Sequence, residues 1–467
     1  MTSSATRSGR PVVNQQRTVQ DGTDALHATA SRKAAFRLLP ILCLTYFMAF
    51  VDRTNVGMAK TSLEADVGIS AAAYGVGAGI FFLSYALLEV PSNLIMYRVG
   101  PRRWITRIAV TWGLLCSCMM FVQDELSFYV VRFLLGAAEA GLYPALMYTV
   151  TIWFSQKQRV TVVGILYLAV CAGFALGAPL GGALMELHGA GGLYGWQWMF
   201  LVEGLLTVVV AYFVWRLVPD RPQDAKWLTA QEAAVLNDRA VVRTAPGHGT
   251  LKGNVRIAFA RPFIIALSLI YFANQVSSVA IQYNFPSIVE SLDVEGSFLI
   301  GVVSGSAGIA SFVGVLVIPW IQRRVRNEVR VVTYVTLATV PVAIAYSVSD
   351  GAVLRILLID AAMLLLVGIL PLYWSVAMAR MSGLMAAAGL AFINTVGLLG
   401  GFVGPYLYGL AEGRGSDSAG HAVLVGAAVL GVLLLPVLHR TVRSEDRRAG
   451  RDADLGSPAG AEAEEVR

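Results

Sequence analysis

Residues 44–57 read LTYFMAFVDRTNVG, which places Asp52 and Arg53 side by side within an otherwise apolar segment. Further along the chain, Arg132 and Glu139 lie within a second apolar segment. A charged side chain at the centre of a bilayer costs about 3 kcal/mol, so such residues need partners, a water-filled cavity or both. Two sets of acid and base in membrane segments therefore predict a pathway for a charged solute.

The composition indicates an integral membrane protein. The chain has 467 residues, of which 56% are hydrophobic and only 14% are charged, and its mean hydropathy is +0.64. Soluble domains carry about 25% charged residues. Apolar segments long enough for membrane helices recur along the chain, which predicts helices rather than a barrel. The four cysteines lie in these segments and are interpreted as structural, and no cofactor or metal is expected.

The fold class predicted is all-α, with twelve transmembrane helices in two pseudo-symmetric six-helix bundles. Residues 219–260 form the longest polar interval and are predicted to link a bundle at 36–218 to a bundle at 261–440. Residues 1–35 and 441–467 are predicted to be cytoplasmic tails, the first of them disordered. The twelve predicted spans are 36–57, 73–97, 104–122, 127–154, 160–184, 195–218, 262–289, 297–321, 330–349, 352–376, 384–411 and 420–440.

The distribution of charge between alternate loops predicts the orientation. One set of loops is rich in basic residues, and the other set contains most of the acidic ones. The basic residues are Arg98, Arg102, Arg103, Lys157, Arg159, Arg323, Arg324, Arg326, Arg330 and Arg380. Because basic loops stay in the cytoplasm, this set, the linker and both termini are predicted to be cytoplasmic. The same bias accounts for the net charge of +6 without a nucleic acid partner.

A repeated motif relates the two halves. Gly173 and Gly177 precede Pro179 in the fifth span, and Gly400 and Gly404 precede Pro405 in the eleventh. Small residues at this spacing let helices approach closely, and proline bends a helix. The matched positions predict a duplicated six-helix unit whose halves rock about a central site.

Several longer motifs together resemble the major facilitator superfamily, and within it the anion:cation symporters that include sugar-acid, tartrate and phthalate permeases. These motifs are residues 39–57, 89–104, 132–141, 195–203, 219–228 and 387–405. Two departures stand out. Tyr97 replaces an aspartate common in the wider superfamily, and residues 280–286 (AIQYNFP) lack the aromatic-rich pattern of these relatives.

The resemblance implies roles for the buried charges and for several polar side chains. The matching acids, Asp52 and Glu139, would carry protons, and the matching arginines, Arg53 and Arg132, would hold the substrate anion. Tyr85, Asn394 and Trp374 align with positions that face the substrate, and Gln282 is a further candidate for reading its polar groups. Arg98, Arg102 and Arg103 would lock the outward-facing state. The alternatives are a purely structural ion-pair network and ordinary hydrogen bonding between helices.

The expected mechanism is competition for the arginines. Seven residues separate Arg132 from Glu139, so both lie on one face of their helix, and each arginine is expected near a carboxylate of the other helix. A substrate carboxylate would displace these acids, so that anion binding and protonation promote one another.

This mechanism predicts proton-coupled uptake of a small organic anion (a sugar acid, a dicarboxylate or an aromatic acid) by a monomer in the inner membrane. Sodium coupling is the second choice of ion. A proton antiporter that exports a drug on the same fold is the alternative function. No phosphate-binding loop, nucleophile cluster or signalling domain indicates an ATP-driven pump, an enzyme or a sensor.

Overall fold

The computed structural model describes residues 11–240, 261–381, 383–414 and 417–455, and within these ranges the fold is entirely helical. Twelve candidate membrane spans are long and apolar enough to cross a bilayer, in agreement with the twelve predicted. The first six spans comprise α1 (Pro11–Met58), α3 (Ala71–Val99), α4 (Pro101–Cys118), the pair α5 (Glu125–Glu139) and α6 (Leu142–Trp153), α7 (Gln156–Met185) and α8 (Gly195–Leu217). The last six comprise α11 (Pro262–Glu290), α12 (Ser297–Val325), α13 (Glu328–Val348), the pair α14 (Ala352–Gly368) and α15 (Leu370–Met378), α16 (Gly383–Glu412) and α17 (Asp417–Leu455).

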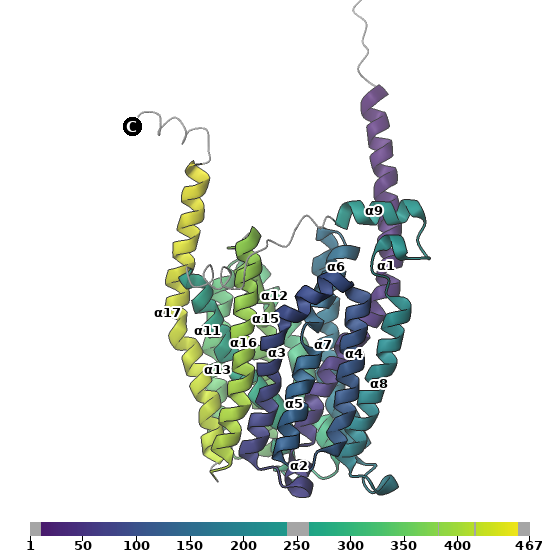
Figure 1. Ribbon diagram of the computed structural model, residues 1–467. Helices are drawn as coiled ribbons and strands as arrows, with labels where there is room; N and C mark the ends of the chain where they lie inside the picture. Colours follow the sequence, from purple (N-terminus) through teal and green to yellow (C-terminus); the bar gives the residue numbers. More distant parts are fainter. Residues whose placement is uncertain (1–10, 241–260, 382, 415–416, 456–467) are drawn as a thin grey trace, which may run out of the picture.

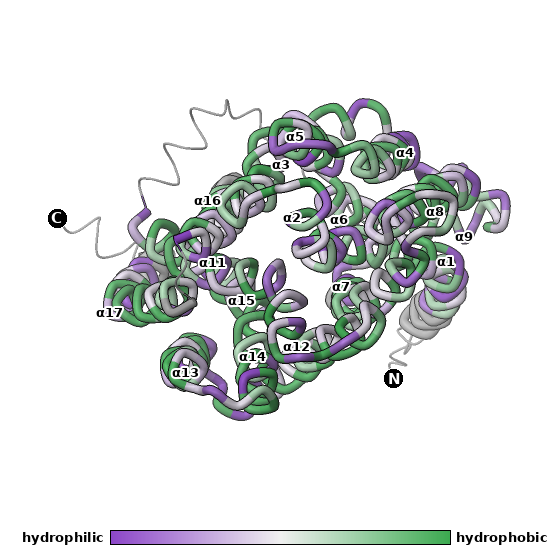
Figure 2. Tube along the Cα trace, turned by 90° about the horizontal axis from the view of Figure 1, so that it is seen from below, coloured by the Kyte–Doolittle hydropathy of each residue, from purple (hydrophilic) through white to green (hydrophobic). Residues whose placement is uncertain are grey.

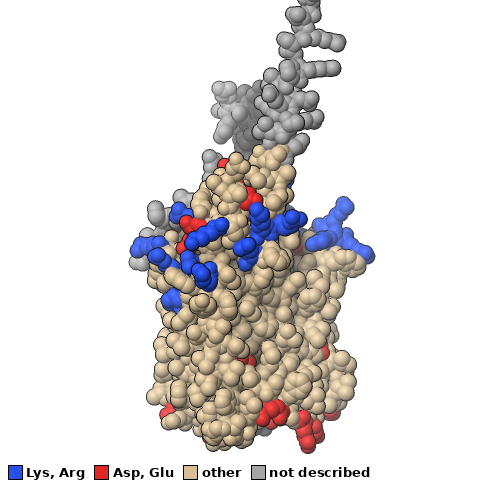
Figure 3. Space-filling view, turned by 90° about the vertical axis from the view of Figure 1, so that its right-hand side faces the viewer, with Lys and Arg blue, Asp and Glu red and all other residues tan. Residues whose placement is uncertain are grey.

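The spans form two groups that lie side by side, α1–α8 and α11–α17 (Figures 1 and 2). The short helix α2 (Lys60–Val67) lies at one end of the molecule, and α9 (Ala230–Ala240) lies at the other end together with the outer ends of α1 and α17 (Figure 1). Lysine and arginine gather at the α9 end, and acidic residues lie at the α2 end (Figure 3). These ends are called the basic end and the acidic end below.

Lipid-facing packing explains why apolar side chains remain on the outside. Leu433 is 68% exposed, Val353 72% and Tyr212 60%, as expected where hydrocarbon rather than water covers the helices. Figure 2 shows hydrophobic residues on most of the helical tubes.

The repeated glycine–proline motif occupies equivalent places in the two halves. A Cβ at Gly177 of α7 would collide with Thr54 of α1, and a Cβ at Gly404 of α16 would collide with the Val276 carbonyl of α11. Each motif thus lets its helix pack closely against the first span of its own half, α7 against α1 and α16 against α11. The opposite side of α7 packs on α12, and α16 packs on α3, so the same two helices also form the interface between the halves.

The tails differ from the predictions. Residues 1–35 were expected to be disordered. Residues 1–10 lie outside the described parts, but α1 begins at Pro11, and Ala30 and Ala34 are fully buried. Lys33 Nζ donates to Glu232 Oε1 of α9 at 2.7 Å, which fixes this extension against the linker. The linker itself therefore contains an ordered helix, while its residues 241–260 lie outside the described parts.

The C-terminal tail predicted from residue 441 is also helical, because α17 continues to Leu455. Arg261 Nη1 donates to Glu445 Oε2 at 2.7 Å, and Arg380 Nε donates to Asp446 Oδ1 at 2.9 Å. In both tails charged side chains form ion pairs with neighbouring elements.

Candidate functional site

A cavity of about 130 Å³ lies between the two halves. The first half contributes α1, α3, α5, α6 and α7, and the second half contributes α11, α14, α15 and α16. The polar and charged lining residues are Tyr46, Arg53, Tyr85, Glu89, Glu139, Tyr143, Tyr167, Tyr271, Gln275, Ser278, Gln282, Trp374 and Asn394. This cavity contains six of the residues that the sequence selected.

Arg53 and Glu139 form an ion pair on the wall of this cavity, which confirms the predicted pairing between these two spans. The Glu139 side chain is 1% exposed, and that of Arg53 is 17% exposed. Rings surround the guanidinium, whose carbon lies 4.7 Å from the Phe50 centroid and 5.8 Å from that of Tyr85. Glu139 Oε2 and Arg53 Nε have no hydrogen-bond partner. The pair is thus incompletely satisfied, as a site that must accept a further ligand would be.

Glu139 lies at a break in the fourth span that the sequence analysis did not anticipate. α5 ends at Glu139, and α6 begins at Leu142 after Gly141, whose φ of +91° strongly favours glycine. Ser92 Oγ donates to the freed carbonyl of Ala140 at 2.6 Å. The tenth span, its counterpart in the other half, breaks between α14 and α15 at Ile369. Broken helices at the level of a central cavity are a recurring feature of transporter sites.

Asp52 does not lie where the sequence placed it. It was expected beside an arginine, but its Oδ2 accepts a hydrogen bond from Trp112 Nε1 of α4 at 3.2 Å, and it is absent from the cavity lining. Because Asp52 and Arg53 are adjacent on a helix, their side chains diverge by about 100°. Arg53 takes the cavity side, so Asp52 faces the interior of the first half.

Arg132 is likewise turned away from the cavity. Its Nε donates to the Gly77 carbonyl at 3.1 Å. Its Nη2 donates to the Ala78 carbonyl and to the Tyr283 hydroxyl, both at 3.3 Å. Its side chain is buried, and no carboxylate forms an ion pair with it in the described chain. In this conformation Arg132 joins α3 to α11 rather than offering its charge to an anion.

The remaining predicted binding residues line the cavity. Tyr85 lies on α3, Gln282 on α11, Trp374 on α15 and Asn394 on α16. Asn394 Nδ2 donates to both carboxylate oxygens of Glu89, at 3.1 and 3.0 Å. Glu89 was not among the binding residues predicted from the sequence, although it lines the cavity. Its position four residues after Tyr85, on the same helical face, is the signal that could have placed it in the cavity.

Comparisons with known proteins identify the family. The Major Facilitator Superfamily profile matches residues 42–405. The chain belongs to this superfamily. A relative from Agrobacterium vitis that carries the name of a tartrate transporter is 37% identical over 90% of this chain and 94% of its own length. The inner membrane transport protein RhmT of Escherichia coli is 34% identical over 90% of this chain and 98% of its own.

Two further comparisons bear on function and fold. A quinolone resistance transporter of Acinetobacter baumannii is 33% identical over 87% of this chain and 94% of its own. A solved bacterial homologue of the lysosomal transporter Spinster, in an inward-facing and occupied conformation, has a TM-score of 0.65. It covers 90% of this chain and 98% of its own at 16% identity. The chain is therefore a multi-pass membrane transporter of the major facilitator fold, and for a bacterial protein the membrane is the inner one.

Most hydrogen bonds that join the halves of this major facilitator protein, within the described residues, lie toward the acidic end. Lys60, at the start of α2, is 3% exposed and donates to Glu412 Oε2 at 2.5 Å and to Asn284 Oδ1 at 2.8 Å. Tyr74 donates to the Tyr283 carbonyl at 3.1 Å. Lys60 was not among the site residues predicted from the sequence. The transporter is thus closed at its acidic end.

The three arginines proposed as a gate lie at the basic end, Arg98 in the last turn of α3 and Arg102 and Arg103 in the first turn of α4. Arg102 Nε donates to the Trp215 carbonyl at 2.6 Å, and its backbone N–H donates to Asp220 Oδ1 at 2.9 Å. Arg98 and Arg103 are exposed. With the orientation predicted from the sequence, a conformation closed at the acidic end faces inward, and a lock for the outward-facing state would be released in it. The gating role of the three arginines stays a prediction.

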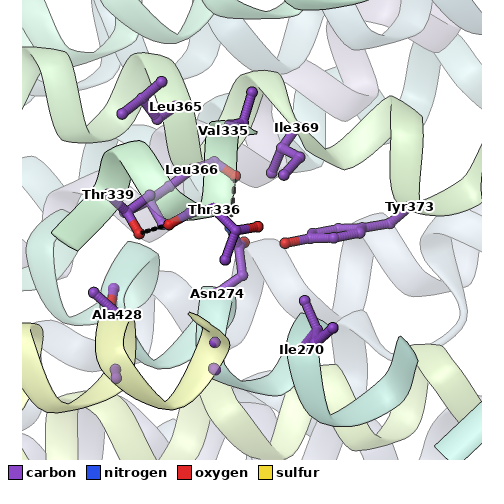
Figure 4. Close-up of a pocket in the computed structure, with 14 residues that line it drawn as sticks. Ile270, Asn274, Val335, Thr336, Thr339, Leu365, Leu366, Ile369, Tyr373 and Ala428 are labelled. Atoms are coloured by element: carbon purple, nitrogen blue, oxygen red, sulfur yellow. Dashed lines mark hydrogen bonds between the residues drawn. The ribbon is translucent and has the colours of Figure 1, made fainter. Parts of the chain in front are cut away.

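A smaller pocket lies wholly within the second half (Figure 4). It measures about 20 Å³ and is lined by Asn274, Thr336 and Tyr373, among others. Asn274 Nδ2 donates to the Leu366 carbonyl at 3.1 Å, close to the break between α14 and α15. This volume suits a single water molecule rather than an organic anion. The cavity between the halves is therefore the candidate substrate site of this family member.

Proposed function

We propose that this protein is a proton-coupled importer of a small organic anion. The observation that carries the proposal is the Arg53–Glu139 pair on the wall of the cavity between the halves. Arg53 is the group that binds a carboxylate, and Glu139 is the group that carries the proton. The relatives named for tartrate transport support a carboxylate as the cargo.

Coupling follows from the fact that one guanidinium serves two carboxylates in turn. In the site without substrate, the Glu139 carboxylate forms an ion pair with the Arg53 guanidinium. An incoming carboxylate accepts bidentate hydrogen bonds from the same guanidinium and displaces Glu139. A buried carboxylate without a counter-charge is costly, so Glu139 takes up a proton when the anion binds. Release of the anion lets Glu139 return to Arg53 and lose that proton.

The orientation proposed from the sequence gives this cycle its direction. With the basic end in the cytoplasm, the described conformation is closed to the outside and corresponds to the stage of cytoplasmic release. Carrying one anionic charge inward against about 100 mV, inside negative, costs about 2.3 kcal/mol, which one accompanying proton cancels for a monoanion. Among the described residues, no group of three or more His, Cys, Asp or Glu side chains could hold a metal ion, and the proposal uses none.

Asp52 has a different proposed part. Asp52 is buried on the side of α1 that faces away from the cavity, where it accepts a hydrogen bond from Trp112. It suits a second proton-binding group, one that responds to movement of α1 and not to contact with the anion. Arg132 serves as a positioning residue that holds α3 and α11 together until the halves separate.

The test is uptake of labelled organic acids into proteoliposomes with an inward proton gradient. The proposal predicts accumulation by the native protein and loss of accumulation in Glu139→Gln and Arg53→Lys. Glu64→Gln, at an exposed site on α2, is the matched control that should behave as the native protein does. If no acid accumulates, or if Glu139→Gln accumulates one as well as the native protein, the proposal is wrong.

The quinolone resistance relative favours one competing function, proton-driven export of a drug on the same fold. The same vesicles distinguish the two, because an antiporter would move its substrate against the proton flow. Accumulation that appears only when the proton gradient is reversed would establish export.

A further inference from the structure

We infer that Lys60 is a second anion-binding group, an outer site that holds an organic carboxylate before it reaches Arg53. The inference rests on the proposed function, import of an organic anion, and adds a step to the path of that anion. At the acidic end the substrate carboxylate takes the place of Glu412 on Lys60. In the cavity it then takes the place of Glu139 on Arg53.

Lys60 and Arg53 are arranged alike. Each is a cation of the first half that forms an ion pair with one carboxylate, Lys60 with Glu412 and Arg53 with Glu139. Lys60 is 3% exposed, and its ammonium also donates to Asn284 Oδ1 at 2.8 Å. An ammonium has three N–H donors, and these two acceptors use two of them.

Opening of the acidic end would leave Lys60 without these partners. Glu412 lies on α16 and Asn284 on α11, so both acceptors belong to the second half, whereas Lys60 belongs to the first. When the halves separate at this end, both acceptors move away together. A cation that loses its partners in a largely apolar setting favours a new anionic partner, and the substrate carboxylate supplies one.

Lys60 also lies on the way to Arg53. It follows Arg53 by seven residues, which is two helical turns or about 10.5 Å along the same face. Helical hydrogen bonding continues through the turn between α1 and α2, where the Ala59 N–H donates to the Asn55 carbonyl at 2.9 Å. Both cations face α11, since Lys60 contacts Asn284 and Arg53 shares the cavity with Gln282.

The contact between α1 and α11 closes the path from Lys60 to Arg53 in the described conformation. A Cβ at Gly57, which lies between the two cations, would be 3.1 Å from the carbonyl oxygens of Gln282 and Tyr283. Tyr74 donates to the same Tyr283 carbonyl at 3.1 Å and to the Val56 carbonyl at 3.0 Å. Separation of the halves breaks this contact and lets the anion pass inward. When the acidic end closes again, Lys60 returns to Glu412 and the anion stays on Arg53.

The charge of the acidic end explains why such a site is useful. Acidic residues gather there (Figure 3), and Glu64 and Asp66 lie on α2 together with Lys60. Negative charge of this kind repels an anion that arrives from that side. Arg355, another cation of this end, donates to the Ser349 carbonyl at 2.6 Å. Lys60 supplies the positive charge that offsets the repulsion at the entrance.

The test is the KM for external acid, from initial rates of uptake by cells that produce the full-length protein. The probes are labelled tartrate, gluconate and benzoate, and empty-vector cells give the background. For an acid that is taken up, Lys60→Met is expected to raise KM at least about tenfold, because it removes a charged hydrogen-bond donor. Glu412→Gln is expected to lower KM roughly four- to tenfold, because an amide competes less well for Lys60. Lys60→Arg should stay near the native value.

The opposite signs separate binding from gating. Lys60→Met and Glu412→Gln break the same ion pair, so a Lys60 that only closed the acidic end would shift KM in the same direction in both variants. Shifts in the same direction would overturn the inference. Arg355→Met removes a positive charge from the same end and should leave KM unchanged. A rise as large as that of Lys60→Met would also overturn it. Thermal unfolding of each purified variant shows that it is folded.

The outcomes for the two proposals are distinguishable. If none of the three acids is taken up with protons, the proposed function fails, and the outer site fails with it. If an acid accumulates with protons but the two variants shift its KM alike, only the outer site fails.

Discussion

The substitution Glu139→Gln should strengthen anion binding while abolishing its coupling to protons. In the native site Glu139 competes with the substrate for Arg53. Hydrogen bonds to charged groups contribute about 1.5–3 kcal/mol, and neutral ones contribute roughly half as much. Replacing the carboxylate by an amide therefore weakens the competitor by about 0.8–1.5 kcal/mol, which corresponds to roughly four- to tenfold tighter binding of the anion.

The pH dependence of binding supplies the decisive comparison. In the native protein, protonation of Glu139 frees Arg53, so the affinity for an anion should rise as the pH falls. In Glu139→Gln the affinity should be independent of pH and close to the native value at low pH. Equilibrium binding of a labelled acid that stays ionised across the range, measured from roughly pH 8.5 to pH 6, reports both quantities.

A stability measurement accompanies this experiment. In Glu139→Gln a neutral amide replaces the charged partner of the largely buried Arg53, so the free energy of unfolding should fall by the same amount, about 0.8–1.5 kcal/mol. Glu139→Gln should therefore unfold at a lower temperature than the native protein when no anion is present, and added anion should restore much of the loss. Weaker anion binding in Glu139→Gln, or binding that still strengthens as the pH falls, would refute the exchange of partners at Arg53.

Other substitutions test the gate and the tails. Lys60→Met should open the acidic end, because it removes both bonds that Lys60 makes across the halves, and distances between spin labels at that end should lengthen. Gly75→Val should hold the same end open, since its Cβ would collide with the Pro405 carbonyl, and labelling of the cavity from outside should increase. The Lys33 ammonium and the Thr229 N–H lower the pKa of Glu232. Glu232 therefore stabilises the docking of α9 fully above its ordinary pKa, and this stabilisation is lost only as the pH falls through the lowered pKa. The loss can be followed as a loss of hydrogen-exchange protection in α9. Lys33→Met should shift it to higher pH.

Hydropathy was sufficient to predict the twelve spans, because only long apolar segments satisfy the bilayer. It gave no warning of the breaks at Gly141 and Ile369, which lie within continuous apolar sequence. At Gly141 the positive φ interrupts the helix and Ser92 caps the freed carbonyl, whereas at Ile369 a proline in the first turn of α15 removes a backbone donor; hydropathy registers neither feature.

The charged residues show a similar division. The Arg53–Glu139 pair was predictable, because a charge in an apolar helix requires a partner and few were available. The orientation of Arg132 was not predictable, since its acceptors are backbone carbonyls of α3 that carry no sequence signature. The partners of Lys60 lie on α11 and α16, far away in the chain, so its burial appeared only when the halves were brought together.

The most direct test of the account follows the proton and the anion in one experiment. Proteoliposomes that contain the purified protein and an internal pH-sensitive dye receive the most tightly bound organic acid, labelled, from outside. The account predicts that each uptake event acidifies the interior, beyond the change in protein-free vesicles, and that Glu139→Gln shows neither acidification nor accumulation. Accumulation of the anion without internal acidification would contradict proton coupling through Arg53 and Glu139.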